Sequence, residues 1–243
     1  MFTKTDLIGL LEACRTRETE WLHRTYGLTD DGIGSLTELV RGPIAVSNRD
    51  PLYRLGAPAD ALHVVQRGAF KSYLVTRSGD LQVTRFHFRG ELVGVDALHN
   101  GHYNSTAAAL EPSYVFRIPV EHMRTLVYTV PGFGRELLNM MSSRILKDER
   151  HMLLINDMPA PARLAAYLLY VDRRQKSVGA GGRLHMPMSR HDLASFLGLA
   201  PETLSRLLTR FFRAGLIAID DLHHITLLND PGLREVAGIA AAG

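Results

Sequence analysis

The chain has little that would tie it to a membrane or to an oxidising compartment. Its 243 residues include a single cysteine, Cys14, which excludes a disulfide bond within the chain. No apolar run approaches the roughly 20 residues that a membrane-spanning helix needs, and the N-terminus lacks the apolar core of a signal peptide. The hydrophobic content of 46% is enough for two folded domains. We therefore expect a cytoplasmic protein with no membrane partner.

Patterns that carry metal or phosphate chemistry are also missing. The 11 histidines are scattered, and no spacing among them is typical of a zinc site. A cupin-like, small-molecule-binding enzyme would need a cluster of histidines and carboxylates on strands, yet only His63 and His87 lie in segments that we expect to be strands. The glycines between residues 56 and 94 are spaced as tight turns and not as a phosphate-binding loop. We therefore expect no metal site and no catalytic residues. The cupin-like enzyme stays a remote alternative, for which the sequence offers no cluster of metal ligands.

The N-terminal half contains two regions with different sequence patterns. Residues 1 to 40 read as amphipathic helical segments. From about Ile44 to Pro119 the chain consists of short runs rich in Val, Leu, Tyr and Phe, such as HVVQRGAFKSYLV and LQVTRFHF, punctuated by glycines. This alternation predicts an antiparallel β-domain with tight turns.

Residues 188 to 216 predict two helices joined by a tight turn. Ser189 can cap the first helix, Gly198 can make the turn, and Pro201 stands where the second helix needs no N–H group. Apolar residues at helical spacing form the buried stripe of the second helix: Leu204, Leu207, Leu208 and Phe211. Two apolar runs then flank Asp220-Asp221, which indicates a hairpin. The segment predicts a winged helix-turn-helix.

The second of these helices carries a polar face suited to reading DNA. Glu202 and Arg206 lie one helical turn apart near its N-terminus, the end that enters the major groove in helix-turn-helix proteins. An arginine can donate two hydrogen bonds to guanine while a glutamate accepts one from the paired cytosine. An ordinary solvated ion pair is the alternative interpretation. We predict these residues to contact DNA: Ser189, Arg190, Glu202, Thr203, Ser205, Arg206 and Arg210.

The segment after Pro131 predicts a long helix that pairs with a second copy. Its apolar residues follow a spacing of three, four, seven and three, which is typical of a parallel helix pair. The predicted seam contains Leu138, Met141, Ile145, Asp148, Met152 and Ile155. A dimer would bring two copies of Asp148 together, which desolvation and like charge disfavour, unless the helix rotates locally and places the carboxylate in water.

The break Asp157-Met158-Pro159 ends this helix, and a further helix is expected at 162 to 174, before a Gly-rich loop at 178 to 183. We therefore predict three parts: N-terminal helices and a β-domain at 1–130, a dimerisation helix at 131–157, and a DNA-binding domain at 158–243.

Three segments, in order along the chain, resemble one family. Glu202-x-x-Ser205-Arg206 within LGLAPETLSRLLTRF is similar to the recognition helix of the FNR branch of the CRP/FNR bacterial transcription regulators. Residues 67 to 98 resemble the β-roll effector domain of that family, and residues 140 to 155 resemble its dimerisation helix. The resemblance covers nearly the whole chain. It implies an α+β fold with an N-terminal cyclic-nucleotide-binding-like β-roll (jelly roll), a long dimerisation helix and a C-terminal winged helix-turn-helix.

The resemblance also implies a function. Family members bind a palindromic operator in double-stranded DNA as homodimers and contact RNA polymerase. In the CRP branch an arginine usually precedes the glutamate, whereas this chain has Pro201 there, which favours an FNR-like TTGAT half-site over TGTGA. Effector, target genes and the choice between activation and repression stay open at this point.

The residues that bind cyclic AMP in relatives are not matched. Those relatives use a glutamate for the ribose hydroxyl and an Arg-Ser pair for the phosphate; this chain has Asp96 and Asn104-Ser105 in those places. A buried phosphate would therefore lose its bidentate guanidinium partner. The resemblance leads us to expect that the protein does not bind cyclic AMP.

The cysteines of the oxygen-sensing members are absent too. Those members hold a 4Fe-4S cluster on three cysteines of the N-terminal segment and one of the β-roll; the resemblance places Cys14, Arg17 and His23 at the first three positions and Phe116 at the β-roll position. One thiolate cannot hold such a cluster. We therefore expect a regulator without this cofactor. Three alternatives stay open for Cys14: an ordinary thiol without a functional role, a redox switch, or a haem or metal contact together with His23. A FixK-like regulator controlled by its expression level or by oxidation of Cys14 is the alternative for the whole protein.

Overall fold

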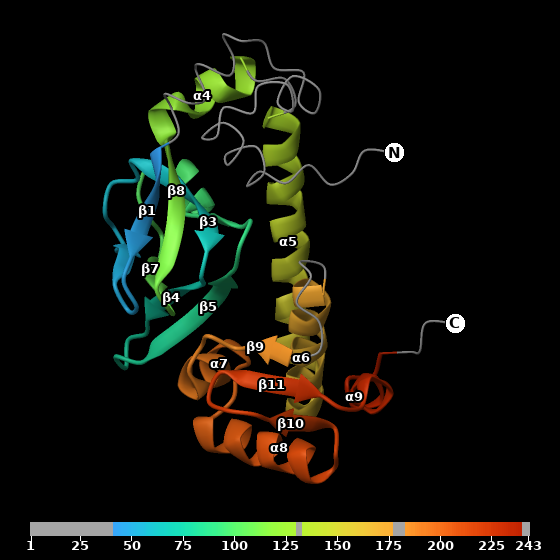
Figure 1. The fold of residues 1–243 in the computed structure, drawn as a ribbon. Helices are drawn as coiled ribbons and strands as arrows, with labels where there is room; N and C mark the ends of the chain where they lie inside the picture. The colour runs from blue at the N-terminus through green and yellow to red at the C-terminus, as the bar shows by residue number, and fades with distance from the viewer. Residues whose placement is uncertain (1–40, 130–132, 177–182, 240–243) are drawn as a thin grey trace, which may run out of the picture. The chain divides into compact units, whose positions relative to one another are not determined.

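The computed structural model describes residues 41–129, 133–176 and 183–239 (Figure 1). The predicted N-terminal helical segments, Cys14 and most of the Gly-rich loop lie outside the described residues. The chain divides into two compact units, which we describe separately: Met1–Val75 with Thr84–Leu146, and Thr76–Val83 with Lys147–Gly243. No helix within the described ranges is long and apolar enough to cross a membrane.

The first unit contains the predicted antiparallel β-domain. Its strands form two four-stranded sheets, in the orders β1-β8-β3-β6 and β2-β7-β4-β5. The strands are β1 Arg41–Val46, β2 Pro51–Tyr53, β3 Ala61–Arg67, β4 Phe70–Val75, β5 Leu81–His87, β6 Leu92–Val93, β7 Thr106–Ala109 and β8 Ser113–Pro119. The pairings of β8 with β1 and β3, and of β7 with β2 and β4, are antiparallel. The expected β-roll is confirmed.

Apolar side chains from both sheets form the core of the β-roll. Val65, Phe70, Val93 and Val115 belong to one buried cluster and come from strands of the two sheets. The turn between β3 and β4 needs Gly68, because its φ is +86° and a Cβ atom there would lie 2.1 Å from the Ser113 hydroxyl. The turn that the sequence predicted at this glycine is therefore confirmed.

Helices follow the β-roll. A 3-10 turn, η1, runs from Val95 to Leu98, and α4 spans Val120–Thr129. The sequence did not predict α4, which begins directly after strand β8 with no capping residue or glycine between them. The long helix α5, Phe133–Asp157, agrees with the predicted dimerisation helix and contributes residues to both units.

The second unit contains the predicted winged helix-turn-helix. Its elements are α6 Ala160–Lys176, β9 Arg183–His185, α7 Arg190–Phe196, α8 Pro201–Arg213, β10 Ile217–Ile219, β11 His224–Leu227 and α9 Asp230–Val236. The hairpin around Asp220-Asp221 is confirmed as β10 and β11, which form a sheet with β9 in the order β10-β11-β9. The short elements β9 and α9 were not predicted. Strand β9 carries His185, and the predicted strand β11 carries His224, so two more histidines lie on strands than the two that the sequence placed there.

The local signals for the two helices are also confirmed. The Ser189 hydroxyl caps α7 by accepting a hydrogen bond from the backbone N–H of Asp192 at 3.0 Å. Gly198 has a left-handed φ of +63°, and Pro201 begins α8. The chain can therefore turn sharply between the two helices without backbone strain, because the residue with positive φ is a glycine.

A buried histidine of the β-roll has no partner for one of its ring nitrogens among the described residues. His63 on β3 is 6% exposed, and its Nδ1 atom has no hydrogen-bond partner. Burial and the Arg117 guanidinium lower the pKa of His63 from 6.5 to about 4, although Asp60 acts in the opposite direction. The imidazole is therefore neutral in the folded protein at pH values where it is charged in the unfolded chain.

We expect acid to destabilise the β-roll through this histidine. The folded pKa lies below the unfolded one, so the contribution of neutral His63 is present above pH 6.5 and is lost as the pH falls toward about 4. The full loss is on the order of 3 kcal/mol in the free energy of unfolding. Urea unfolding of wild type and His63→Leu at several pH values measures it. If both proteins lost stability equally between these limits, His63 would not be the cause.

Candidate nucleic-acid interface

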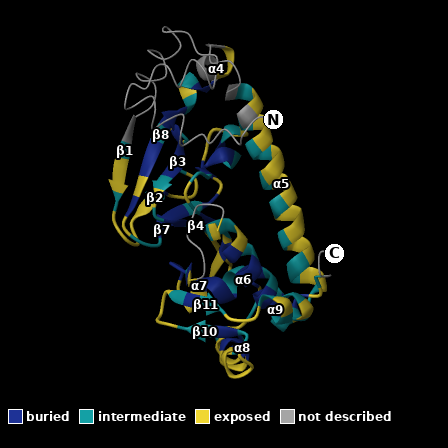
Figure 2. Ribbon diagram, turned by 45° about the vertical axis from the view of Figure 1, so that its right-hand side comes forward, coloured by how far each residue is buried: buried dark blue, intermediate teal, exposed yellow. Residues whose placement is uncertain are grey.

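Helix α8 has one buried face and one exposed face. The predicted stripe is buried, with Leu204, Leu207, Leu208 and Phe211 all at 8% exposure or less. These side chains pack α8 against the rest of the second unit, where it contacts α6, α7 and β10. The polar residues of the other side are exposed: Glu202, Ser205, Arg206, Thr209, Arg210 and Arg213. Figure 2 colours much of α8 as exposed.

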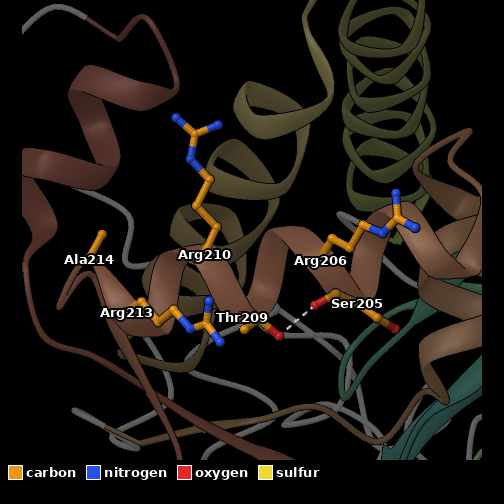
Figure 3. A pocket seen from close by; sticks show the side chains of 6 residues that line it. All are labelled: Ser205, Arg206, Thr209, Arg210, Arg213 and Ala214. Atoms are coloured by element: carbon orange, nitrogen blue, oxygen red, sulfur yellow. Dashed lines mark hydrogen bonds between the residues drawn. The ribbon is translucent and has the colours of Figure 1, made fainter.

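Part of this outward face is an open hollow of about 620 Å³. The residues that line it are Ser205, Arg206, Thr209, Arg210, Arg213 and Ala214 (Figure 3). The Thr209 hydroxyl donates a hydrogen bond to the Ser205 carbonyl at 3.0 Å and is thereby held close to the helix. The rim of the hollow is consequently formed by longer, cationic side chains.

The three arginines of the hollow have no carboxylate partner among the described residues. Arg206, Arg210 and Arg213 form no ion pair with any described residue, and they extend from the helix in Figure 3. Glu202, one turn before Arg206, is exposed and likewise forms no ion pair in the described part of the chain. The intrahelical ion pair that the spacing also allowed is therefore not formed, and these groups remain available to an external partner with phosphates and base edges.

The other predicted DNA contacts are placed differently. Ser189 and Arg190 are exposed at the start of α7, and Thr203 is half-buried on α8; none of them lines the hollow. The Ser189 hydroxyl also donates to Asp192 Oδ2 at 2.8 Å, so it is already engaged in capping. Thr209 lines the hollow but was not among the predicted contacts, although its position four residues after Ser205 is a signal that could have found it.

The wing between β10 and β11 is held by charge pairs. Arg183 on β9 donates to Asp220 Oδ2 at 3.2 Å and to Asp221 Oδ2 at 2.8 Å. Asp221 also accepts a hydrogen bond from the backbone N–H of His223 and contacts His224 Nδ1 at 2.9 Å. These two contacts are the main cause that lowers the pKa of Asp221. Both wing carboxylates therefore have cationic or donor partners on the protein itself.

The predicted seam residues all lie on α5. Leu138, Ile145 and Met152 are 65%, 58% and 63% exposed, which is unusual for large apolar side chains. Figure 2 colours much of α5 as exposed. Met141 and Ile155 are half-buried, and Asp148 is exposed. Helix α5 thus presents an apolar face along its length.

Asp96, Asn104 and Ser105, which the resemblance aligns with the cyclic-AMP-binding positions, are held by other residues of the first unit. Asp96 Oδ1 lies 3.7 Å from Arg144 Nη2 on α5, and its carbonyl accepts a hydrogen bond from the Asn104 side chain at 3.1 Å. Ser105 is buried. Burial, followed by the charge of Asp96, raises the pKa of the neighbouring Tyr53 hydroxyl. No group of histidine, cysteine and carboxylate side chains within the described residues could hold a metal ion.

The chain matches known proteins along most of its length. A model of the Crp-like helix-turn-helix domain matches residues 162–236, and a model of the cyclic nucleotide-binding domain matches residues 43–129. The fumarate and nitrate reduction regulatory protein of Escherichia coli strain K12 is 34% identical over 214 residues, covering 88% of this chain and 85% of that protein. The corresponding protein of Klebsiella oxytoca is 34% identical over 216 residues, covering 88% and 86%.

Solved structures share the fold. FixK2 from Bradyrhizobium japonicum superposes with a TM-score of 0.73 and 28% identity, covering 82% of this chain and 98% of that one. A CRP-family transcriptional regulator from Thermus thermophilus has a TM-score of 0.66 and 22% identity, with the same coverage of 82% and 98%. The second comparison supports the fold alone.

Sequence and structure thus agree on the two domains and on their order. The cyclic nucleotide-binding match covers the β-roll and α4, and the helix-turn-helix match begins within α6 and ends with α9. The similarity to the Escherichia coli regulator extends through both. The chain belongs to the CRP/FNR family of transcription regulators, with a cyclic-nucleotide-binding-like β-roll and a DNA-binding helix-turn-helix.

Proposed function

We propose that this regulator binds, as a homodimer, a palindromic operator with FNR-like TTGAT half-sites, and that it acts on transcription by contacting RNA polymerase. The observation that carries the proposal is the outward face of α8. That face presents one exposed carboxylate and three guanidinium groups that no described residue neutralises. Contact with RNA polymerase rests on family membership.

Different residues of this face have different roles. Arg206 and Glu202 lie near the N-terminal end of α8, which is the end that reads base edges in helix-turn-helix proteins. Arg206 donates to O6 and N7 of guanine, and Glu202 accepts from N4 of the paired cytosine. Arg210 and Arg213 lie in the last turn and contact phosphates, where positive charge raises affinity for any sequence.

The exposed apolar face of α5 forms the dimer. Leu138, Ile145 and Met152 would be removed from water by the same residues of a second copy, which supports a parallel helix pair. Two recognition helices related by two-fold symmetry then read half-sites that are one helical turn apart, ~34 Å. Asp148 adds a like charge to this face and keeps the dimer marginal.

We further propose that DNA binding needs neither cyclic AMP nor an iron-sulfur cluster. The chain has no guanidinium at Asn104-Ser105, and its only cysteine is Cys14. A FixK-like mode, with control by expression level or by oxidation of Cys14, is the second candidate. The structural similarity to FixK2, at 28% identity across 82% of this chain, is compatible with this second candidate.

Base reading by Arg206 is tested by comparing two arginines of the same helix. We expect Arg206→Ala to lose ~1 to 3 kcal/mol of binding free energy on a TTGAT palindrome and to relax the preference at one base pair, because the bidentate contact to guanine is removed. Arg213→Ala is the matched control and should weaken binding to all DNA similarly. Titrations use the palindrome and scrambled DNA at one salt concentration. An unchanged ratio of the two affinities in Arg206→Ala would refute base reading by this residue.

Independence from a cofactor is tested on protein purified in air and stripped of metal. We expect it to bind the TTGAT palindrome at full affinity in a band-shift titration, because the proposed DNA binding needs no metal or cluster that these conditions would remove. Absorption spectra of aerobic and anaerobic preparations serve as the control, since a haem or a cluster would show a visible band. Binding that required cyclic AMP or anaerobic assembly of a cluster would contradict the proposal.

The role of Asp148 is tested by removing its charge. We expect Asp148→Ala to shift the monomer-dimer equilibrium toward dimer by ~1 to 4 kcal/mol, because two like charges leave an apolar seam. DNA affinity should rise with it, since only the dimer engages both half-sites. Sedimentation at matched concentrations measures the dimer constant, and Glu149→Ala, at the next exposed position, controls for a general change in charge. Equal dimer constants for wild type and Asp148→Ala would place Asp148 in water.

A further inference from the structure

Three helix ends of the second unit meet at one arginine. Arg163 lies in the first turns of α6, directly after the break that separates α6 from α5. The end of α7 and the turn of the helix-turn-helix lie against it. Neither the predicted DNA contacts nor the predicted seam includes this residue.

The Arg163 guanidinium joins the break to the turn by hydrogen bonds. Its Nε–H donates to the Met158 carbonyl at 2.8 Å. Its Nη1 group donates to the Leu197 carbonyl at 3.1 Å and to the Gly198 carbonyl at 3.2 Å. One side chain therefore binds the backbone just after the end of α5 and the backbone at the end of α7.

The chemistry of these partners explains why an arginine is needed. The last carbonyl groups of a helix have no partner within the helix, and they form the negative end of its dipole. Met158 follows α5 and Leu197 is the C-cap of α7, so a cation placed between them satisfies both ends. A guanidinium is planar and holds several N–H donors in fixed directions, whereas a lysine is a single, mobile charge. Lysine cannot reproduce this geometry.

Aromatic and close apolar contacts connect the same helices. The His151 ring on α5 stacks on Phe196 of α7, with ring centroids 4.0 Å apart and an interplanar angle of 14°. Tyr167 of α6 meets Phe196 edge-on at 5.5 Å. A Cβ atom at Gly198 would lie 3.2 Å from Ile155 Cγ2 and 3.3 Å from Arg163 Nη1, so the turn approaches both helices closely. The last turns of α5 and the helix-turn-helix therefore form one packed body.

We propose that Arg163 is a positioning residue that fixes the helix-turn-helix on the end of the dimerisation helix. It thereby sets the separation and the angle at which the two recognition helices of a dimer meet their half-sites. This inference rests on the proposed dimeric binding to a palindrome. Arg163 contacts no DNA in this role. It affects only the separation and the angle between the two helix-turn-helix domains of the dimer.

A positioning residue can be distinguished from a residue that only stabilises the fold by comparing binding to a half-site with binding to a palindrome. A half-site is read by one recognition helix, and its affinity depends only on the fold of one helix-turn-helix. A full palindrome adds the second contact at an effective concentration set by geometry, which commonly strengthens binding by about 10²- to 10⁴-fold. Loss of the Arg163 bonds should reduce this gain and leave the half-site affinity intact.

The experiment measures binding of full-length protein to three kinds of DNA. They are a single TTGAT half-site, the palindrome, and palindromes with the spacer changed by about one base pair, which rotates one half-site by roughly 35°. The variants are Arg163→Lys and Arg163→Gln. Arg173→Lys is the matched control, since Arg173 is exposed on the same helix and its Nε bonds only to Leu169 of that helix.

We expect the Arg163 variants to bind the half-site within about twofold of wild type and to lose roughly 10-fold on the palindrome, with a flatter dependence on spacer length. The control should match wild type on all three. His151→Leu, which removes the ring stack but keeps the guanidinium, should show the same pattern more weakly. Agreement of the two independent substitutions would support positioning through this body.

Two results would overturn the inference. An equal loss on half-site and palindrome would show that Arg163 serves only the folding of the helix-turn-helix. An unchanged palindrome affinity and spacer preference in both Arg163 variants would show that it serves neither. Failure of the proposed function is recognised separately, because wild type itself would then gain nothing from the second half-site.

Discussion

Burial of the apolar stripe of α8 is the constraint on which the DNA-facing surface depends. Leu204, Leu207, Leu208 and Phe211 can leave water only against the second unit, and their burial fixes the rotation of α8 about its own axis. Every polar residue between them is then forced outward, including Arg206. A recognition surface is thus a consequence of core packing, since the same helix rotated by half a turn would bury its charges at a large cost.

Arginine serves two physical tasks in this unit, and exposure decides which. Arg206 and Arg210 have no partner among the described residues and keep their donors for an external anion. Arg163 and Arg183 instead direct their donors to the protein, to helix-end carbonyls and to the wing carboxylates. In the proposed complex with DNA, the first pair would supply affinity. The second pair holds the surrounding elements in place, because a guanidinium fork is rigid enough to fix two backbones or two carboxylates at once.

Much of the fold was predictable because its signals are local. A serine cap, a glycine with positive φ and a proline at a helix start act within a few residues, so Ser189, Gly198 and Pro201 marked the helix-turn-helix correctly. Elements without such signals were missed: α4 follows β8 directly, and β9 has only three residues whose pairing with β11 is non-local. Thr209 was missed as part of the exposed face, although helical spacing from Ser205 would have included it.

The sequence by itself determined the two-domain organisation, the helix-turn-helix, the wing and most of the outward face of α8, because periodicity and capping depend on neighbours along the chain. Only the tertiary structure decided which charges are already used. It paired Asp96 with Arg144, Arg183 with the wing, and Arg163 with carbonyls 34 and 35 residues away. Such contacts join residues that are distant in sequence, and no local pattern encodes them; they arise when packing brings the helix ends together.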